Sequence, residues 1–404
     1  MSTLAIIGAG AAGLAAAIAA KRAGAGRVLL LERLPRAGKK LLVTGNGRCN
    51  FTNTDLSIEH YHGDRTFAAQ VIERFGTAQA IEFFESVGVP PYVEDGRVYP
   101  KSESAAGLLD ALRVAAEGCE LVENFAVAKL RKIDDRWEIC ADDGRKIVAD
   151  AVIVAAGGCA SPKFGSDGSG FELFRALGYE ISPLQPALVQ LKVAKPSVTA
   201  LKGIRVRAEV KASGGGETIH AERGEVLFTD YGLSGIPIFQ VTARKPCDTV
   251  VLDFMPELSD GDLTAKLERR RAIFSAKTAE DFFVGMLHKR LGNMVFRAAG
   301  VEKLSLEVAK FDDKLLEKLA HCLKNFAFEI GGRMGFDSAQ VTAGGVRARQ
   351  FSPTTMESLG DRRLYAAGEV LDVHGDCGGY NLHWAWATGQ IAGIAAAQAI
   401  REEK

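Results

Sequence analysis

The first 32 residues contain the feature that most restricts the fold of this chain. A short apolar run, 4–7, leads into Gly8-Ala9-Gly10-Ala11-Ala12-Gly13 and an Ala-rich stretch, and a second apolar run, 28–31, ends at Glu32. This order of strand, glycine-rich turn, helix and strand is the fingerprint of a dinucleotide-binding βαβ unit. It predicts an α/β fold with a parallel sheet of the Rossmann type.

Each part of this fingerprint has a physical role. Gly8 permits the tight turn, Gly10 lets the backbone approach a pyrophosphate, and Gly13 lets the helix pack near the strand. The helix N-terminus offers free N–H groups to the phosphates, and Glu32 is placed to accept a hydrogen bond from a ribose hydroxyl. We therefore expect the pyrophosphate to bind at Gly8, Ala9, Gly10, Ala11 and Gly13. The fingerprint alone does not distinguish NAD from FAD.

Composition limits the class of protein. A chain of 404 residues predicts two or three domains, and the equal numbers of basic and acidic residues, 50 each, argue against nucleic acid or an anionic membrane as the main partner. The seven cysteines form no CxxC pair and no metal-ligand spacing, which is typical of reduced thiols in a cytoplasmic protein without a metal. We also expect no signal peptide and no membrane span. Nothing in the sequence specifies an oligomeric state.

Sequence patterns change twice along the chain. Residues 186–256 alternate apolar and polar side chains, as antiparallel strands do, whereas 261–325 have helical periodicity and many charges. From Leu364 the opening pattern of strand, glycine-rich turn and Ala-rich helix returns. We therefore predict a Rossmann-like domain built from both chain ends (1–185 and 340–404), an inserted β-barrel-like domain (186–258 and 326–339) and a small helical domain (259–325).

A second glycine-rich cluster makes the cofactor prediction more specific. Ala366-Ala367-Gly368-Glu369 ends a predicted strand, and Gly378-Gly379-Tyr380-Asn381-Leu382 opens the last helix. A strand ending in Ala-Gly-Glu before such a helix recurs in flavoproteins with two dinucleotide-binding domains. Glu369 is suited to a ribityl hydroxyl, and the helix N-terminus to negative charge at the pyrimidine edge of a reduced flavin. The predicted cofactor is therefore FAD.

The fingerprint, the segment Gly38–Asn53 and the C-terminal cluster together resemble the BaiN-type flavoprotein family of NAD(P)/FAD-dependent oxidoreductases. The resemblance covers nearly the whole chain and implies an FAD domain, an inserted β-barrel-like domain and a small helical domain. Members of the family are associated with reduction of conjugated double bonds in steroid-like substrates, and others are called aminoacetone oxidases.

Further cofactor-binding residues are predicted in the glycine-rich segments. Lys39 and Lys40 are candidates for phosphate or ribityl oxygens, with a solvated basic turn as the alternative, and the backbone of 44–50 is suited to lie along the isoalloxazine. Val127, which we place at the end of a strand, is a candidate for packing on the adenine or for an ordinary core position. The full set beyond the fingerprint is Glu32, Arg33, Lys39, Lys40, Thr44, Gly45, Asn46, Gly47, Arg48, Cys49, Asn50, Val127, Ala156, Gly157, Gly158, Gly368, Glu369, Gly379, Tyr380, Asn381 and Leu382.

Candidates for catalysis are Arg48, Tyr380 and His383. Arg48 is suited to stabilise an anionic flavin or a substrate oxyanion, with a structural ion pair as the alternative. Tyr380 and His383 are candidates for the proton donor that a reductase needs, as are His374, Tyr231 and Asp230, with an ordinary hydrogen-bonding role as the alternative for each. Cys49 and Cys377 are either a redox pair or inert thiols.

These observations predict a soluble FAD-dependent oxidoreductase in which flavin N5 transfers hydride to or from a small organic substrate. A second GxGxxG fingerprint is absent from the sequence, so NAD(P)H, if it is the electron donor, docks transiently without a domain of its own. NAD(P)H-linked reduction of a conjugated double bond is one such reaction, and it is suggested by the family resemblance. An amine or aminoketone oxidase is the first alternative, and an FAD-binding module in RNA modification or redox sensing is the second.

Overall fold

The computed structural model describes residues 2–194 and 196–401, which separate into two compact units. The first unit comprises Met1–Ala187 and Gly335–Lys404, and the second comprises Leu188–Met334. One α/β unit is thus built from both ends of the chain, and the other is inserted between them. The predicted fold class is confirmed.

A five-stranded parallel sheet forms the centre of the first unit, in the order β20-β11-β1-β2-β7. Ile7 pairs with both Leu31 and Val154, and Val154 pairs with Ala366, so the carboxyl ends of four strands lie in a row. The five strands are β1 (Thr3–Ile7), β2 (Arg27–Leu31), β7 (Glu120–Val122), β11 (Ala151–Val154) and β20 (Leu364–Ala366).

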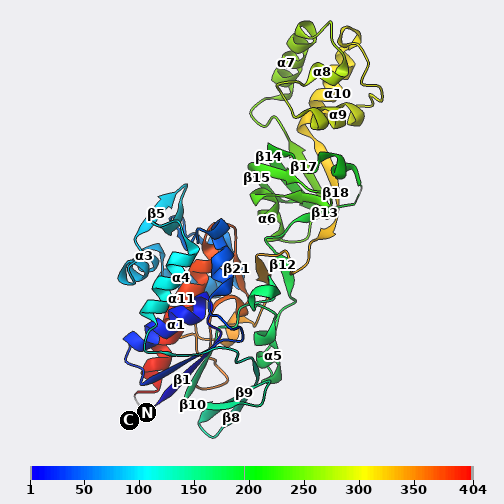
Figure 1. Cartoon of the computed structure of the whole chain (residues 1–404). Helices are drawn as coiled ribbons and strands as arrows, with labels where there is room; N and C mark the ends of the chain where they lie inside the picture. The colour runs from blue at the N-terminus through cyan, green and yellow to red at the C-terminus, as the bar shows by residue number, and fades with distance from the viewer. Residues whose placement is uncertain (1, 195, 402–404) are drawn as a thin grey trace. The chain divides into compact units, whose positions relative to one another are not determined.

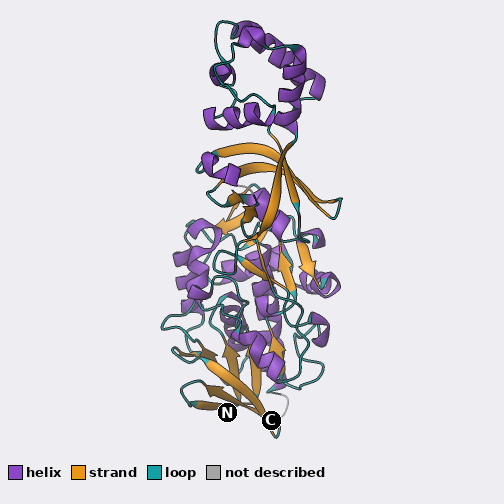
Figure 2. Ribbon diagram, turned by 90° about the vertical axis from the view of Figure 1, so that its right-hand side faces the viewer, coloured by secondary structure: helices purple, strands orange, loops and turns teal. Residues whose placement is uncertain are grey.

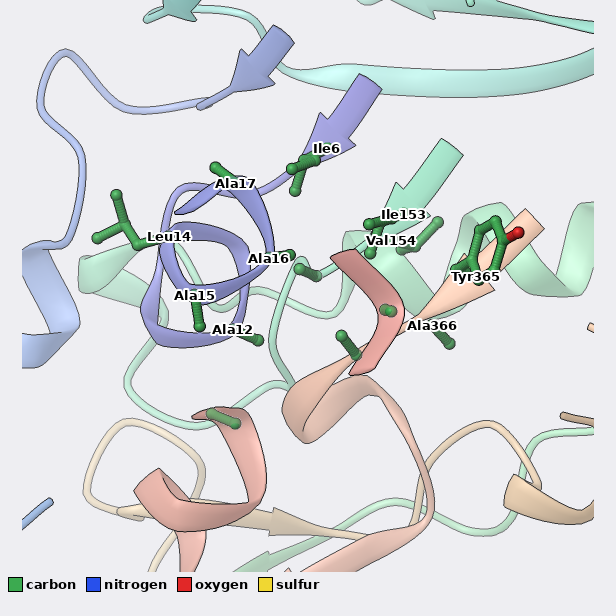
Figure 3. Close-up of a cluster of buried hydrophobic side chains, with 14 of the residues drawn as sticks. Ile6, Ala12, Leu14, Ala15, Ala16, Ala17, Ile153, Val154, Tyr365 and Ala366 are labelled. Atoms are coloured by element: carbon green, nitrogen blue, oxygen red, sulfur yellow. The ribbon is translucent and has the colours of Figure 1, made fainter. Parts of the chain in front are cut away.

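Two alanine-rich helices, α1 (Ala11–Arg22) and α11 (Tyr380–Ala399), lie against each other beside this sheet (Figure 1). A Cβ atom added to Gly389 would lie 2.4 Å from the carbonyl oxygen of Ala12, so the backbones approach closely. Alanine side chains of α1 and apolar side chains of β1 and β11 form the core at this point (Figure 3). Small residues therefore allow the first and last helices of the chain to pack together.

The remaining elements of the first unit surround this centre. They are β3 (Thr52–Asn53), β4 (Tyr61–Gly63), α2 (Arg65–Arg74), α3 (Thr77–Ser86), β5 (Pro91–Glu94), β6 (Arg97–Pro100), α4 (Ala105–Ala115), β8 (Val127–Ile133), β9 (Arg136–Ala141), β10 (Lys146–Ala149), α5 (Ser169–Ala176), β12 (Gln185–Ala187), β19 (Val341–Ala343) and β21 (Val373–Gly375). Short 3-10 helices are η1 (Lys39–Gly47), η2 (Ile58–His60), η3 (Pro162–Phe164), η6 (Ala348–Gln350) and η7 (Gly368–Val370).

Two boundaries differ from the patterns in the sequence. Apolar side chains near helical spacing over 66–88 predict one helix, but the structure has two, because the chain at Gly76 is extended (φ −90°, ψ −168°) between α2 and α3. The sequence of 119–127 predicts one strand that ends at Val127, but this strand is interrupted, because Asn124 has a left-handed conformation (φ 52°). Val127 therefore begins β8 and does not end a strand of the parallel sheet, which corrects our placement of this residue.

The second unit contains a closed barrel of six strands, in the order β13-β16-β15-β14-β17-β18. Gly215 and Gly216, both with positive φ, form the hairpin turn between β14 and β15. The strands are β13 (Leu191–Val193), β14 (Arg205–Gly214), β15 (Glu217–Phe228), β16 (Gly232–Ser234), β17 (Thr249–Asp253) and β18 (Phe326–Arg333).

Helices of the second unit lie beside the strands of the barrel (Figure 2). Their buried side chains form one hydrophobic core with those of the barrel. The backbone N–H of Phe254, after β17, donates to the carbonyl of Leu323 in α10, and the rings of Phe254 and Phe326 lie 5.6 Å apart. Barrel and helices therefore form one compact unit. The helical elements are η4 (Pro196–Leu201), α6 (Ile236–Thr242), α7 (Asp260–Ile273), α8 (Ala279–Phe282), α9 (Lys289–Ala298), η5 (Val308–Lys310) and α10 (Asp313–Lys324).

Three further findings concern the described residues. All seven cysteines are free thiols, so Cys49 and Cys377 are not joined by a disulfide. No cluster of His, Cys, Asp or Glu within 2–194 and 196–401 has the arrangement of a metal site. None of the helices in these ranges has the length and hydropathy needed to cross a membrane.

Candidate functional site

Four predicted segments begin at the aligned carboxyl ends of the parallel strands. Gly8 follows β1, Glu32 follows β2, Ala155 follows β11 and Ala367 follows β20. Ligands of open parallel α/β sheets bind at this edge, where the loops diverge. The sheet thus places the predicted cofactor-binding residues of these four segments at one edge.

Within the fingerprint loop, two glycines are required by packing and one is not. A Cβ atom on Gly8 would lie 2.5 Å from the carbonyl oxygen of Ala155, and one on Gly13 would lie 1.8 Å from that of Gly8. Gly10 has a φ of −85°, which any residue adopts, and no protein atom lies within 4 Å of the position of its Cβ. The surface at Gly10 is therefore open, as the close approach of a ligand requires.

Glu32 fixes the conformation of this loop. Its side chain is buried, with Oε2 accepting the N–H of Ala9 at 3.0 Å and Oε1 accepting the N–H of Leu34 at 2.9 Å. The N–H of Ala9, which we expected to face a pyrophosphate, is thus used within the protein. Arg33 forms an ion pair with Asp167.

The C-terminal Ala-Gly-Glu segment lies directly against the fingerprint helix and the loop after β11. A Cβ on Gly368 would be 2.9 Å from the Cβ of Ala12, and one on Gly158 would be 2.7 Å from Oε1 of Glu369. Gly157 beside it has a left-handed φ of 76°, and the Cβ of Ala156 lies against Gly170. Residues that are more than 350 positions apart in the sequence, Ala12 and Gly368, thus form one surface.

The loop from Thr44 to Asn53 meets the beginning of α11. Gly45 and Asn46 (φ 55° each) and Gly47 (φ 85°) are exposed in left-handed conformations. Glycine adopts this conformation freely, whereas it is strained for Asn46, and such strain is common at ligand sites. A Cβ on Gly379 would lie 2.6 Å from the carbonyl oxygen of Thr52 and 2.8 Å from Oδ1 of Asn50. Gly379 therefore lets this loop touch the N-terminus of α11.

Three observations fit FAD at this edge. The surface at Gly10 is open. The first N–H groups of α11, after Gly379, lie where an α-helix has no internal acceptors for them. Oδ1 of Asn50 is buried without a donor among the described residues, and a bound group with an N–H would satisfy it. The phosphates at Gly10 and the pyrimidine edge at α11 remain our prediction.

Arg48 is held by the protein itself. Its guanidinium lies 2.9 Å from carboxylate oxygens of both Glu94 and Glu103, and 4.1 Å from the centre of the Tyr99 ring. Hydrogen bonds to the two carboxylates raise the pKa of Arg48. Arg48 thus forms the structural ion pair that we predicted as the alternative to a catalytic role.

The two predicted proton donors on α11 differ in environment. His383 is fully buried, and its two ring nitrogens lie 2.8 Å from Oγ1 of Thr52 and 2.8 Å from the carbonyl oxygen of Phe75. Burial lowers its pKa to about 4, so it is a neutral core residue at physiological pH. The Tyr380 ring stacks on His60 at 4.4 Å, and burial raises the pKa of its phenol. Both features make His383 and Tyr380 weak candidates for proton transfer.

For most of the other predicted site residues, the structure shows contacts within the protein. The side chain of Asn381 bonds the N–H and the carbonyl of Gly375 at 2.8 Å each, and Leu382 packs on the core. Thr44 donates to the carbonyl of Leu41, and Lys39 begins η1. Burial raises the pKa of the Cys49 thiol to about 12, so that thiol is inert. Asp230 and Tyr231 lie in the second unit, where Asp230 pairs with Lys202.

Sequence reasoning missed His60 and His62. Both lie beside Asp376, just before the N-terminus of α11. The available signal was the alternation His60-Tyr61-His62, which places both imidazoles on one side of an extended chain.

Comparisons with known proteins agree with this geometry. The family model of the HI0933-like protein Rossmann domain matches residues 2–395. The chain is 38% identical to 3-dehydro-bile acid delta(4,6)-reductase of Clostridium scindens, over 98% of this chain and all of that protein. It is 29% identical to ribosomal RNA dihydrouridine synthase of Escherichia coli, over 95% of each chain. A flavocytochrome c3 fumarate reductase resembles it in fold (TM-score 0.52, 19% identity, 99% of this chain and 79% of that chain).

Proposed function

The chain belongs to the HI0933-like Rossmann family, and from this premise we propose that it is an FAD-dependent reductase of a carbon–carbon double bond conjugated to a carbonyl group. The enzyme class and the resemblance to BaiN-type flavoproteins are confirmed by the family relationship. The substrate class and the electron donor are the proposed part.

The observation that carries the proposal is the meeting of three glycine-rich segments at one edge of the parallel sheet. Gly10 offers an open surface, Glu369 lies beside Gly158, and Gly379 joins the 44–53 loop to α11. When bound, FAD supplies a two-electron hydride donor and acceptor. The residues of this edge would hold its phosphates, its ribityl chain and its pyrimidine edge.

The relatives support the substrate class. The Clostridium scindens protein is named as a reductase of bile-acid double bonds. The Escherichia coli protein is named as a synthase of dihydrouridine, and making dihydrouridine from uridine also saturates a double bond next to a carbonyl. The shared chemistry favours reduction over oxidation of an amine. We propose NAD(P)H as the donor that reduces the flavin, docking transiently.

A uridine in RNA is the second candidate substrate, favoured by 29% identity over 95% of both chains. The balance of 50 basic and 50 acidic residues favours a small molecule, because RNA-binding surfaces carry excess positive charge. The higher identity of 38% to the bile-acid reductase of Clostridium scindens also favours a small-molecule substrate.

Anaerobic spectroscopy tests the proposal. The purified protein should be yellow, should release FAD on denaturation, and should be bleached by NADH or NADPH. A 3-oxo-4,6-diene steroid should then restore the oxidised spectrum, whereas an unmodified RNA fragment should not. Bleaching by amines alone would contradict the proposal in favour of an oxidase, and reoxidation by RNA alone would favour the second candidate.

A further inference from the structure

A carboxylate shared by two histidines lies beside the predicted flavin site. Oδ1 of Asp376 lies 2.8 Å from Nε2 of His62, and Oδ2 lies 3.3 Å from Nδ1 of His60. The Asp376 side chain is only 3% exposed, and the His62 side chain is 19% exposed. A buried carboxylate thus holds a partly accessible imidazole.

The backbone places these groups on one side of a small ladder. Strands β4 and β21 pair in antiparallel register, with His62 opposite His374, and their rings lie 5.2 Å apart. The N–H of Asp376 donates to the carbonyl of His60. Tertiary pairing, and not a local motif, therefore joins residues 60–62 to 374–376.

Hydrogen bonds connect Asp376 to the N-terminus of α11. The side-chain amide of Asn381, in the first turn of the helix, donates to the carbonyl oxygens of Gly375 at 2.8 Å and Asp376 at 3.3 Å. Asp376, which precedes α11, is thus held against the first turn of the helix that is predicted to face the flavin pyrimidine edge.

The two histidines differ in what their ring nitrogens contact. Both nitrogens of His60 face carboxylates, those of Asp376 and Asp55, and its ring stacks on Tyr380. His62 uses only Nε2, and within 2–194 and 196–401 its Nδ1 has no hydrogen-bond partner. A carboxylate at one nitrogen fixes the tautomer and leaves the other nitrogen to exchange a proton, as in a carboxylate–histidine dyad.

We propose that His62 donates the proton that completes double-bond reduction, and that Asp376 is its positioning residue. Saturating the double bond requires one hydride and one proton. Bound and reduced FAD would supply the hydride equivalent. Protonated His62 would give its Nδ1 proton to the neighbouring carbon, would keep the Nε2 proton that faces Asp376, and would be protonated again at Nδ1 by solvent. This inference rests on the proposed function and adds to it the residue that acts as the acid.

The other candidate proton donors on α11 are less suitable than His62. The phenol of Tyr380 has a raised pKa, and His383 is buried in the core. The titratable groups that contact His62 or share its partner are His374, Asp376 and His60, and those that contact His60 are Asp55 and Tyr380. Arg97 adds positive charge near Tyr380.

The test separates reduction of the flavin from its reoxidation. Holoenzyme reduced anaerobically with dithionite is mixed with a 3-oxo-4,6-diene steroid while flavin absorbance is followed. In His62→Gln, reoxidation should slow by about 100-fold, the low end for loss of a general acid. FAD content and the rate of flavin reduction should stay unchanged. The rate of flavin reoxidation in the wild type should fall as pH rises, whereas in His62→Gln it should not depend on pH. Added imidazole should restore the reoxidation rate of His62→Ala.

Two further measurements distinguish positioning from a structural role. Nitrogen-15 NMR of the imidazoles should show the His62 proton on Nε2 in the wild type, and this preference should be lost in Asp376→Asn. His220→Gln is the matched control, because His220 pairs with Glu222 at 3.0 Å in the second unit, and its pH profile should equal the wild-type profile.

The outcomes are distinct. An unchanged rate and pH profile in His62→Gln, with the wild type reoxidised normally, would overturn the role of His62 and leave the proposed function intact. Failure of the steroid to reoxidise the wild type would contradict the function itself. A neutral His62 imidazole that carries its single proton on Nδ1, and not on Nε2, would contradict the pairing with Asp376.

Discussion

Nζ of Lys40 lies 2.9 Å from Oε2 of Glu369, an ion pair that joins the 3-10 helix after the fingerprint unit to the turn after β20. Oε1 of the same carboxylate accepts the N–H of Thr342 at 2.8 Å. Glu369 therefore joins three segments at the strand edge where we place FAD, and we predict that it also accepts a hydrogen bond from a ribityl hydroxyl.

Removing this carboxylate should weaken FAD binding. In Glu369→Ala, Lys40 and the N–H of Thr342 lose their acceptor, so we expect the FAD dissociation constant to rise by about tenfold or more, as for loss of a hydrogen bond to a charged group. Titration of apoprotein with FAD measures this change. Glu369→Gln keeps an acceptor for Thr342 and should have a smaller effect. Normal FAD affinity in a destabilised Glu369→Ala protein would restrict Glu369 to a structural role.

Substitution of Gly10 should remove FAD without unfolding the protein. The position of its Cβ is free of protein atoms within 4 Å, and its φ is acceptable to valine, so Gly10→Val should leave the melting temperature of the apoprotein unchanged. The added methyl groups would occupy the surface where the phosphates bind, and the purified variant should be colourless. The contrast is Gly13→Ala, whose Cβ would lie 1.8 Å from the carbonyl oxygen of Gly8 and should prevent folding. A yellow Gly10→Val protein would show that the phosphates lie elsewhere.

The sequence predicted the parallel sheet and its cofactor-binding edge because those features depend on local patterns. Gly8, Gly13 and Gly368 are glycines for reasons of packing that a fingerprint records, and the inserted barrel shows the alternation of antiparallel strands. The division of 66–88 and of 119–127 was missed because single residues, Gly76 and Asn124, have conformations that apolar periodicity does not reveal.

Roles of individual polar side chains were harder to predict, because they depend on partners that are distant in sequence. His383 forms hydrogen bonds with Thr52 and Phe75, and Arg48 forms ion pairs with Glu94 and Glu103. In the same way, His62 gains its carboxylate from a residue 314 positions away. No spacing rule connects such pairs. We therefore named His383 from its residue type and its place in a glycine-rich segment, and we did not name His62.

Close packing of the first and last helices should make small residues there essential for stability. A Cβ on Gly389 would lie 2.4 Å from the carbonyl oxygen of Ala12, and backbone atoms of α1 must move to admit it. We expect Gly389→Ala to lower the free energy of unfolding by about 1–3 kcal/mol, measured by urea denaturation. Gly261→Ala, on α7 with open space around its Cβ, is the control and should be neutral or stabilise by up to about 1 kcal/mol. Equal effects of both variants would contradict the close packing of α1 and α11.

Burial of neutral His383 should make stability depend on pH. The pKa of His383 falls from an ordinary value of 6.5 to about 4 in the folded protein, because burial opposes the charged form. The unfolded chain therefore binds a proton between these values that the folded protein does not, and stability is full above 6.5 and is lost as pH falls toward 4. The loss at the lower limit is about 3 kcal/mol at 1.36 kcal/mol per pKa unit.

Urea denaturation of His383→Gln and wild type between pH 7 and about 4 checks this linkage, because the variant lacks the group that titrates over this range. Glutamine can replace some hydrogen bonds of the imidazole, so the variant should be less stable at pH 7 but should lose less stability on acidification. Parallel pH dependences in the two proteins would show that His383 does not resist protonation in the fold. The same result would restore it as a candidate proton donor, because its imidazole would then titrate near neutral pH.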